Sequence, residues 1–242
     1  MPPPTEERWL EIAAGFEANA DFPNCVRALD GKNIRVKKTP CSGSRFYNYK
    51  GYFSVVLMAV ADSDYRFVLV DIGSYGSSTD ARIFKTSRMG QQLQSEELSL
   101  PEPRTLPGSR GPPAPYVIVG DEGFGLTKNV MRPFARLGLD RRHRIFNYHL
   151  TRAQRYMDAL QLGREKVTAV VKACVVLHNF SRIHDGETVL VEDVPQQPLC
   201  THHEAGSPPG RGDISGLPVR DQFADYFIGP EAVSWQEHMI HG

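Results

Sequence analysis

Two short apolar segments of the chain each lead to an aspartate that has a glycine one or two residues after it. The first, residues 25–29, leads into Asp30, and the second, residues 116–119, leads into Gly120 and Asp121. Apolar runs of this length that stop at a turn signal are typical of buried strands. Two carboxylates at the ends of neighbouring strands are suited to hold divalent cations over a phosphodiester. Taken alone, Asp30 is more simply a turn residue, because Asp-Gly is a common turn dipeptide.

Length and charge set the first limits on function. The chain has 242 residues with 28 basic and 28 acidic side chains, so its formal net charge is zero. We therefore expect one domain with appendages, and any nucleic-acid binding must come from local patches rather than from a global basic field. None of the four cysteines has Cys-x-x-Cys spacing, which argues against a zinc ribbon or a redox pair.

No apolar run is long enough to cross a bilayer, and the N-terminal residues lack the apolar core of a signal peptide. These features predict a soluble protein in a reducing compartment inside the cell.

The order of predicted elements indicates the fold class. After a helix over residues 5–16, the predicted strands are residues 26–29, 33–37, 53–61, 65–72 and 116–119. The predicted helices are residues 79–94, 127–134, 151–163 (with a capping box at Thr151) and 164–182. Hairpins followed by alternating strand and helix fit a mixed α/β fold of the ribonuclease-H-like kind, with a mixed sheet flanked by helices.

Several motifs, in order, resemble the DDE endonuclease domain of PIF/Harbinger-type transposases and their domesticated nuclease relatives. The resembling segments are residues 22–34, 46–54, 61–67, 79–84, 119–124, 131–133, 146–148 and 177–180. The resemblance implies an organisation in four parts. These are a helical lead-in (residues 1–20), the DDE endonuclease-like domain (21–182), a flexible Pro/Gly-rich linker (183–218) and a C-terminal tail (219–242).

The resemblance also implies a triad of carboxylates. By position, Asp30 matches the first aspartate and Asp121 the second, whereas the third residue of the family is a glutamate on a following helix. Within residues 154–160 of this chain, Asp158 stands nearest to that glutamate, but counts from the two flanking motifs disagree and indicate a deletion near residues 156–161. Asp158 is either a shortened ligand or a solvated residue, since an aspartate carboxylate reaches about 1.5 Å less far than a glutamate one.

The family function implied is hydrolysis of DNA phosphodiester bonds with Mg²⁺ or Mn²⁺, in the nucleus or also in the cytoplasm. Asp30 would bridge two cations, Asp121 would hold one of them, and Asp158 would complete the set. The alternative is a degenerate, catalytically inactive copy that acts as a DNA- or protein-binding module. Arg27 stands where the family has a glycine, and no helix-turn-helix portion precedes the core. We therefore expect target recognition to require a separate DNA-binding partner protein or a missing exon.

Other residues keep two interpretations at this stage. Asp80 is either a helix-start carboxylate or a supporting acid near the metals. Glu122 either supports the metal ligands beside Asp121 or points away from them, because neighbouring strand residues point to opposite faces. The charged and aromatic residues 45–50 either grip a phosphate backbone or pack as a solvated loop. The basic run 141–144 either touches DNA or forms a charged turn.

Overall fold

The computed structural model describes residues 4–38, 42–63, 67–95, 97–158, 214–230 and 232–240, without the side chains of residues 67, 69 and 156–158. All of these belong to one compact unit, formed by residues 1–158 and 209–242. The other unit, residues 159–208, lies outside the described residues, as does the helix predicted over 164–182. Among the described helices, none combines the length and the apolar character that crossing a bilayer requires.

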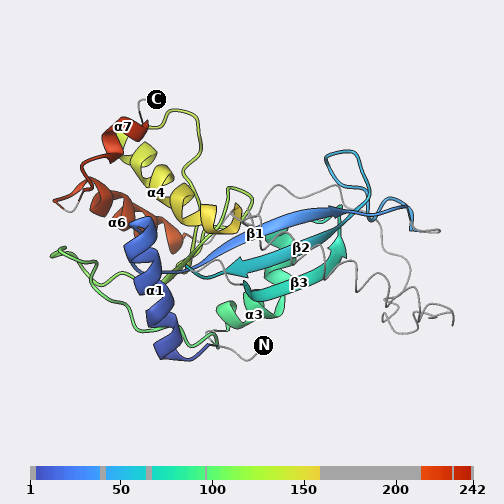
Figure 1. Cartoon of the computed structure of the whole chain (residues 1–242), viewed down its shortest axis with the longest axis horizontal. Helices are drawn as coiled ribbons and strands as arrows, with labels where there is room; N and C mark the ends of the chain where they lie inside the picture. Colours follow the sequence, from blue (N-terminus) through green and yellow to red (C-terminus); the bar gives the residue numbers. More distant parts are fainter. Residues whose placement is uncertain are drawn as a thin grey trace, which may run out of the picture. The chain divides into compact units, whose positions relative to one another are not determined.

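A five-stranded mixed sheet is the centre of this unit. The strands are β1 (Cys25–Arg35), β2 (Ser54–Ala61), β3 (Phe67–Tyr75), β4 (Val117–Val119) and β5 (Val130–Met131). Their order in the sheet is β3-β2-β1-β4-β5. The long strands β1, β2 and β3 pair antiparallel and lie side by side in Figure 1, whereas β1–β4 and β4–β5 are parallel. This arrangement confirms the predicted mixed α/β, ribonuclease-H-like class.

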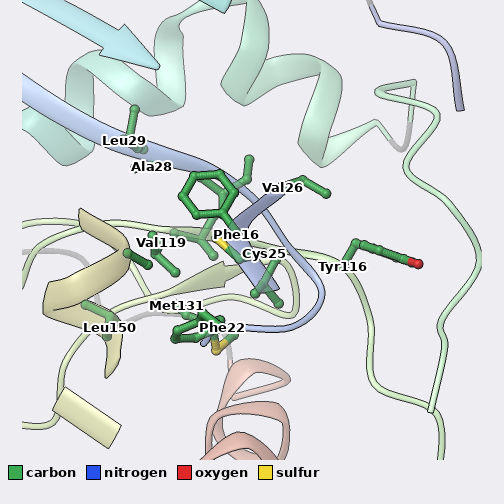
Figure 2. Packing of buried hydrophobic residues seen from close by; sticks show 14 of the residues in the cluster. Phe16, Phe22, Cys25, Val26, Ala28, Leu29, Tyr116, Val119, Met131 and Leu150 are labelled. Atoms are coloured by element: carbon green, nitrogen blue, oxygen red, sulfur yellow. The ribbon is translucent and has the colours of Figure 1, made fainter. Parts of the chain in front are cut away.

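Helices flank the sheet. They are α1 (Glu6–Ala20), α2 (Asp80–Thr86), α3 (Arg88–Gln94), α4 (Arg141–Asp158), α6 (Gly216–Ile228) and α7 (Gln236–Ile240). Trp9 and Phe16 of α1 are fully buried, and Phe22 meets the rings of α4 and α6. Figure 2 shows how side chains from the helices and from β1 and β4 converge in this core, among them Phe16, Phe22 and Val119.

Strand β1 is longer than the sequence predicts. The two predicted strands, residues 26–29 and 33–37, form one continuous strand that pairs with β2 from Ala28 to Arg35. The Asp30-Gly31 turn signal is overridden because an unbroken partner strand supplies ladder hydrogen bonds on both sides of it. Asp30 therefore lies within a strand and not at its end.

The predicted helix over residues 127–134 is wrong. Val130 and Met131 form β5, which pairs in parallel with Ile118 and Val119 of β4. The Thr127 hydroxyl accepts a hydrogen bond from the Val130 amide at 3.1 Å and closes a tight turn before the strand. Two buried apolar residues beside an open strand edge gain more from pairing than from one turn of helix.

The helix start predicted at Thr151 is also wrong, because α4 begins ten residues earlier, at Arg141. The Asp140 carboxylate accepts a hydrogen bond from the His143 amide at 2.8 Å and so caps the helix. Thr151 instead donates its hydroxyl to the Asn147 carbonyl at 2.8 Å, which is how a threonine behaves inside a helix. The predicted helix 79–94 is likewise two helices, separated at Ser87.

Arg27, the departure from the family pattern, is 3% exposed. Its guanidinium lies 4.1 Å from the centre of the Trp9 ring, and Nη1 donates to the Met89 sulfur at 3.0 Å. Its Nε finds no hydrogen-bond partner, and burial lowers the pKa of the guanidinium to about 9. No carboxylate in the described part of the chain forms an ion pair with it, so α1, β1 and α3 enclose a charge that only a ring and a sulfur atom compensate.

Replacing Arg27 with methionine should raise the free energy of unfolding by about 1–4 kcal/mol. Methionine keeps an unbranched stem against Trp9 and Met89 and removes the buried charge. Urea unfolding measures the change, and Arg35→Met, at an exposed position of the same strand, is the control. A variant less stable than the parent protein would show that the guanidinium contacts outweigh the desolvation of the charge.

Candidate active site

The strand register brings Asp30 and Asp121 to neighbouring positions. Ala28 of β1 lies opposite Val119 of β4 in the parallel pair, and each aspartate follows two residues later. The chain keeps its direction beyond β4, because the Gly120 amide donates to the Met131 carbonyl at 2.9 Å. Asp30 lies in β1 and Asp121 lies just beyond β4, so this register sets the two aspartates at equivalent positions of adjacent chain segments.

Short local hydrogen bonds orient both carboxylates. Oδ1 of Asp30 accepts the Gly31 amide, and Oδ1 of Asp121 accepts the Gly123 amide, each at 2.8 Å. Arg132 supports the turn after Asp121 by donating from Nη1 to the Phe124 carbonyl at 3.3 Å. Both aspartates are only partly buried, so these local hydrogen bonds hold carboxylates that still reach the surface.

A third carboxylate, that of Asp80, joins them from α2. Thr79 caps this helix by accepting the Arg82 amide, which leaves Asp80 as the first helical residue. A Cβ placed on Gly31 would lie 2.2 Å from Oδ1 of Asp80. The carboxyl of Asp80 therefore rests on the backbone of Gly31, directly after Asp30, and any side chain at residue 31 would displace it.

The electrostatics reflect this crowding. Burial, followed by the negative charges of Asp121 and Asp30, raises the pKa of Asp80 to about 6, while Lys50 opposes the rise. Burial also raises the pKa of Asp121; the Gly123 amide opposes this shift, and the charge of Glu122 adds to it. Carboxylates that repel one another in a partly desolvated site are stabilised by a bound cation, which removes the repulsion.

The donor chemistry of the site suits a hard divalent cation. Carboxylate oxygens are the protein ligands that Mg²⁺ and Mn²⁺ favour. Within the described residues, however, no three His, Cys, Asp or Glu side chains form a ready metal-binding group. Asp158 is the last residue of α4, and its side chain lies outside the described part of the chain. The structure thus brings together Asp30, Asp80 and Asp121, and the role predicted for Asp158 stays a prediction.

Comparison with known proteins gives the family. The family model for a DDE superfamily endonuclease matches residues 29–179, a range that includes Asp30, Asp80, Asp121 and Asp158. The chain belongs to the DDE superfamily endonuclease family. This DDE chain is 27% identical over 247 residues to "Protein ALP1-like" of Arabidopsis thaliana, an alignment that covers 90% of the chain and 57% of the relative. It is 23% identical over 186 residues to "Putative nuclease HARBI1" of Rattus norvegicus, covering 70% of the chain and 49% of that protein.

The DDE chain therefore spans about half the length of the curated relatives that it matches. No solved structure gives a significant match to it.

The basic run 141–144, for which the sequence left two interpretations open, is engaged within this DDE chain. Arg141 forms an ion pair with Glu237 of α7, and Arg142 pairs with Asp225 at 2.5 Å and with Asp221 at 3.3 Å, both on α6. These arginines connect the start of α4 to the C-terminal helices, which is an ordinary structural use of surface charge.

The structure places Asp80 and Lys50 at the site more definitely than the sequence does. In the sequence, the position of Asp80 after a threonine cap is fully explained by helix capping. In the structure, its carboxyl also contacts the backbone of Gly31. Lys50 lies thirty residues away from Asp80 in sequence, yet its charge acts on the Asp80 carboxyl. Both residues lie in segments that resemble the family, which is the sequence signal for them. The resemblance does not indicate which carboxylate each of them approaches.

Proposed function

We propose that this chain is a divalent-metal-dependent DNA endonuclease, derived from a transposase, that hydrolyses phosphodiester bonds with Mg²⁺ or Mn²⁺. The observation that carries the proposal is the convergence of Asp80 with Asp30 and Asp121. Membership of the DDE superfamily endonuclease family supports it, as does a relative whose name calls it a putative nuclease.

Each residue has a definite part in this proposal. Asp30 and Asp121 provide the main cation ligands, and Asp158, at the end of α4, provides the third. Asp80 adds negative charge beside Asp30 and is ionised only above about pH 6, the value to which its pKa is raised. Bound divalent cations supply the activation of water and the neutralisation of charge on the phosphate and the leaving oxygen. Lys50, whose charge acts on the Asp80 carboxyl, attracts the DNA backbone.

The proposal includes a cellular setting. The substrate is DNA, the protein acts in the nucleus or also in the cytoplasm, and a separate DNA-binding protein supplies target specificity. The last point is supported by the net charge of zero, which gives the chain little general affinity for nucleic acid.

Purified protein should convert supercoiled plasmid to the nicked form in Mg²⁺ or Mn²⁺ and lose this activity in EDTA. Asp30→Ala should be inactive, with an unchanged circular dichroism spectrum. Agarose gel densitometry measures the conversion. The hydrolytic function is wrong if neither metal supports nicking, or if the nicking persists in Asp30→Ala and therefore comes from a contaminant.

The third carboxylate can be identified by comparing two variants. Asp158→Asn should abolish nicking, because it removes a proposed ligand. Asp80→Asn should weaken Mn²⁺ binding by about 10- to 100-fold, the usual effect of removing a group that supports the ligands. Isothermal titration calorimetry with Mn²⁺ and nicking rates measure both. Full activity in Asp158→Asn together with none in Asp80→Asn would move the third ligand to Asp80.

The second candidate is an inactive copy that acts as a DNA- or protein-binding module. It is favoured by the shortened third-acid region and by the lack of a complete group of metal ligands among the described side chains. This candidate predicts DNA binding that is indifferent to divalent cations and no nicking under any condition above.

A further inference from the structure

One stretch of this electrically neutral chain carries positive charge with no negative charge interspersed in the sequence. Residues 31–61 contain no Asp or Glu and six basic residues, which are Lys32, Arg35, Lys37, Lys38, Arg45 and Lys50. The stretch comprises the second half of β1, the connection to β2, and β2 itself. Its charged residues fall in the first two of these parts, so the connection between the strands carries a local field of one sign.

Within this connection, a turn around Asn48 is held firmly. The Asn48 side chain is buried, and its Oδ1 accepts the amides of Lys50 at 3.0 Å and Tyr52 at 3.2 Å. Its Nδ2 donates to the Ser54 hydroxyl at 2.9 Å, which in turn donates to Asn33 Oδ1 of β1 at 2.7 Å. This network fixes the turn to the sheet, so the residues at its tip are presented in one backbone conformation.

Tyr49 stands at that tip and is 84% exposed. Other rings of this region pack against neighbours: Tyr47 lies 5.2 Å from Phe53, and the Arg35 guanidinium lies 4.3 Å over Tyr52. The Tyr49 ring instead meets the Lys50 ammonium, at 5.4 Å from its centre. A large aromatic face exposed on a rigid turn can stack on a planar ligand with little loss of conformational entropy.

The connection that carries this turn is also bonded to the segment just before Asp80. The Ser77 amide donates to the Arg45 carbonyl at 3.1 Å, and the Gly76 amide donates to the Ser54 carbonyl at 3.0 Å. The Lys50 charge accordingly acts on the Asp80 carboxyl.

We propose that Tyr49 and Lys50 form a clamp for DNA with an unpaired base, in which the Tyr49 ring stacks on the base and the Lys50 ammonium binds the adjoining phosphate. The clamp requires an unpaired base because the bases of an intact duplex already stack on each other. The position of this phosphate at the acidic cluster (Asp30, Asp80 and Asp121) rests on the proposed endonuclease function. The stacking of Tyr49 on a base does not depend on that function.

The test is fluorescence anisotropy of the full chain with labelled oligothymidylate, and with a labelled duplex, in EDTA so that no cleavage occurs. Tyr49→Ala should weaken binding of the single strand by about 5- to 100-fold, while Tyr49→Phe, which keeps the ring, should bind like the parent protein. Duplex binding should change little in either variant. Tyr49 is exposed, so neither substitution disturbs the core.

Lys50 has a separate signature. Lys50→Gln should reduce the slope of log affinity against log salt concentration by about 0.7 for the single strand, as loss of one phosphate contact does. Lys128→Gln, at an exposed lysine in the turn before β5, is the matched control and should leave the slope unchanged.

Equal binding of the single strand by Tyr49→Ala and the parent protein would overturn the clamp, as would an equal loss on single strand and duplex. The two proposals fail separately. Absence of plasmid nicking together with Tyr49-dependent binding refutes the hydrolytic function and leaves the clamp, whereas nicking without Tyr49-dependent binding does the reverse.

Discussion

Asparagine in place of Asp121 should lower the rate of Mg²⁺-dependent plasmid nicking by about a thousandfold or more. The substitution keeps the size of the side chain and its ability to accept the Gly123 amide, but removes the negative charge that a cation requires. Loss of several kcal/mol of transition-state stabilisation corresponds to a rate decrease of this order. Initial rates at saturating Mg²⁺ measure the effect, and calorimetric titration with Mn²⁺ should show weakened binding.

The neighbouring residue provides the control. Glu122 is exposed, and Glu122→Gln removes one negative charge from the same turn. Its nicking rate should equal that of the parent protein, because the change leaves the acidic cluster intact. Equal losses in the two variants would mean that the general charge of the turn matters and not ligation by Asp121. An unchanged metal affinity in Asp121→Asn would refute the site assignment itself.

Alanine in place of Phe22 should lower the free energy of unfolding by about 3–5 kcal/mol, the usual cost of removing a buried phenyl ring. Phe22 is fully buried, and its ring centre lies 5.2 to 6.4 Å from those of Phe146, Phe223 and Phe227. The cavity would open between α4, α6 and the start of β1, where rigid elements on three sides limit collapse. Equilibrium unfolding in urea measures the loss.

Leu10→Ala is the matched control, since Leu10 lies on α1 and is 41% exposed. It should cost less than about 0.5 kcal/mol. If Phe22→Ala were as mild as this control, the aromatic cluster would not be the packing centre that its burial indicates.

The sequence was sufficient to predict the fold class, because long runs of alternating or continuous apolar residues form buried strands whichever strand they pair with. The sequence predicted individual elements less well wherever pairing with another strand decides which structure a segment adopts. The Asp30-Gly31 dipeptide predicts a turn, and only the partner strand β2 makes it the middle of β1. Residues 130–131 are too few to show a pattern of their own, and they become a strand because β4 has an open edge.

The candidate site shows the same division. Asp30 and Asp121 could be paired from their positions after apolar runs, since parallel neighbours bring such residues together. Asp80 could not be assigned in this way, because a helix-start aspartate has a complete local explanation. Its approach to Asp30 depends on the lack of a side chain at Gly31, and such a close contact across elements leaves no periodic trace in the chain.

The central place of β1 has a consequence during biosynthesis. β1 leaves the ribosome before its partners. β2 soon covers one of its edges, but the other edge waits for Val119, and the Phe22 ring waits for Phe223. The nascent chain therefore shows an uncovered strand edge until β4 has emerged and an open aromatic surface until α6 has emerged, the features that chaperones shield from aggregation. Chains released before that helix should accumulate in the insoluble fraction.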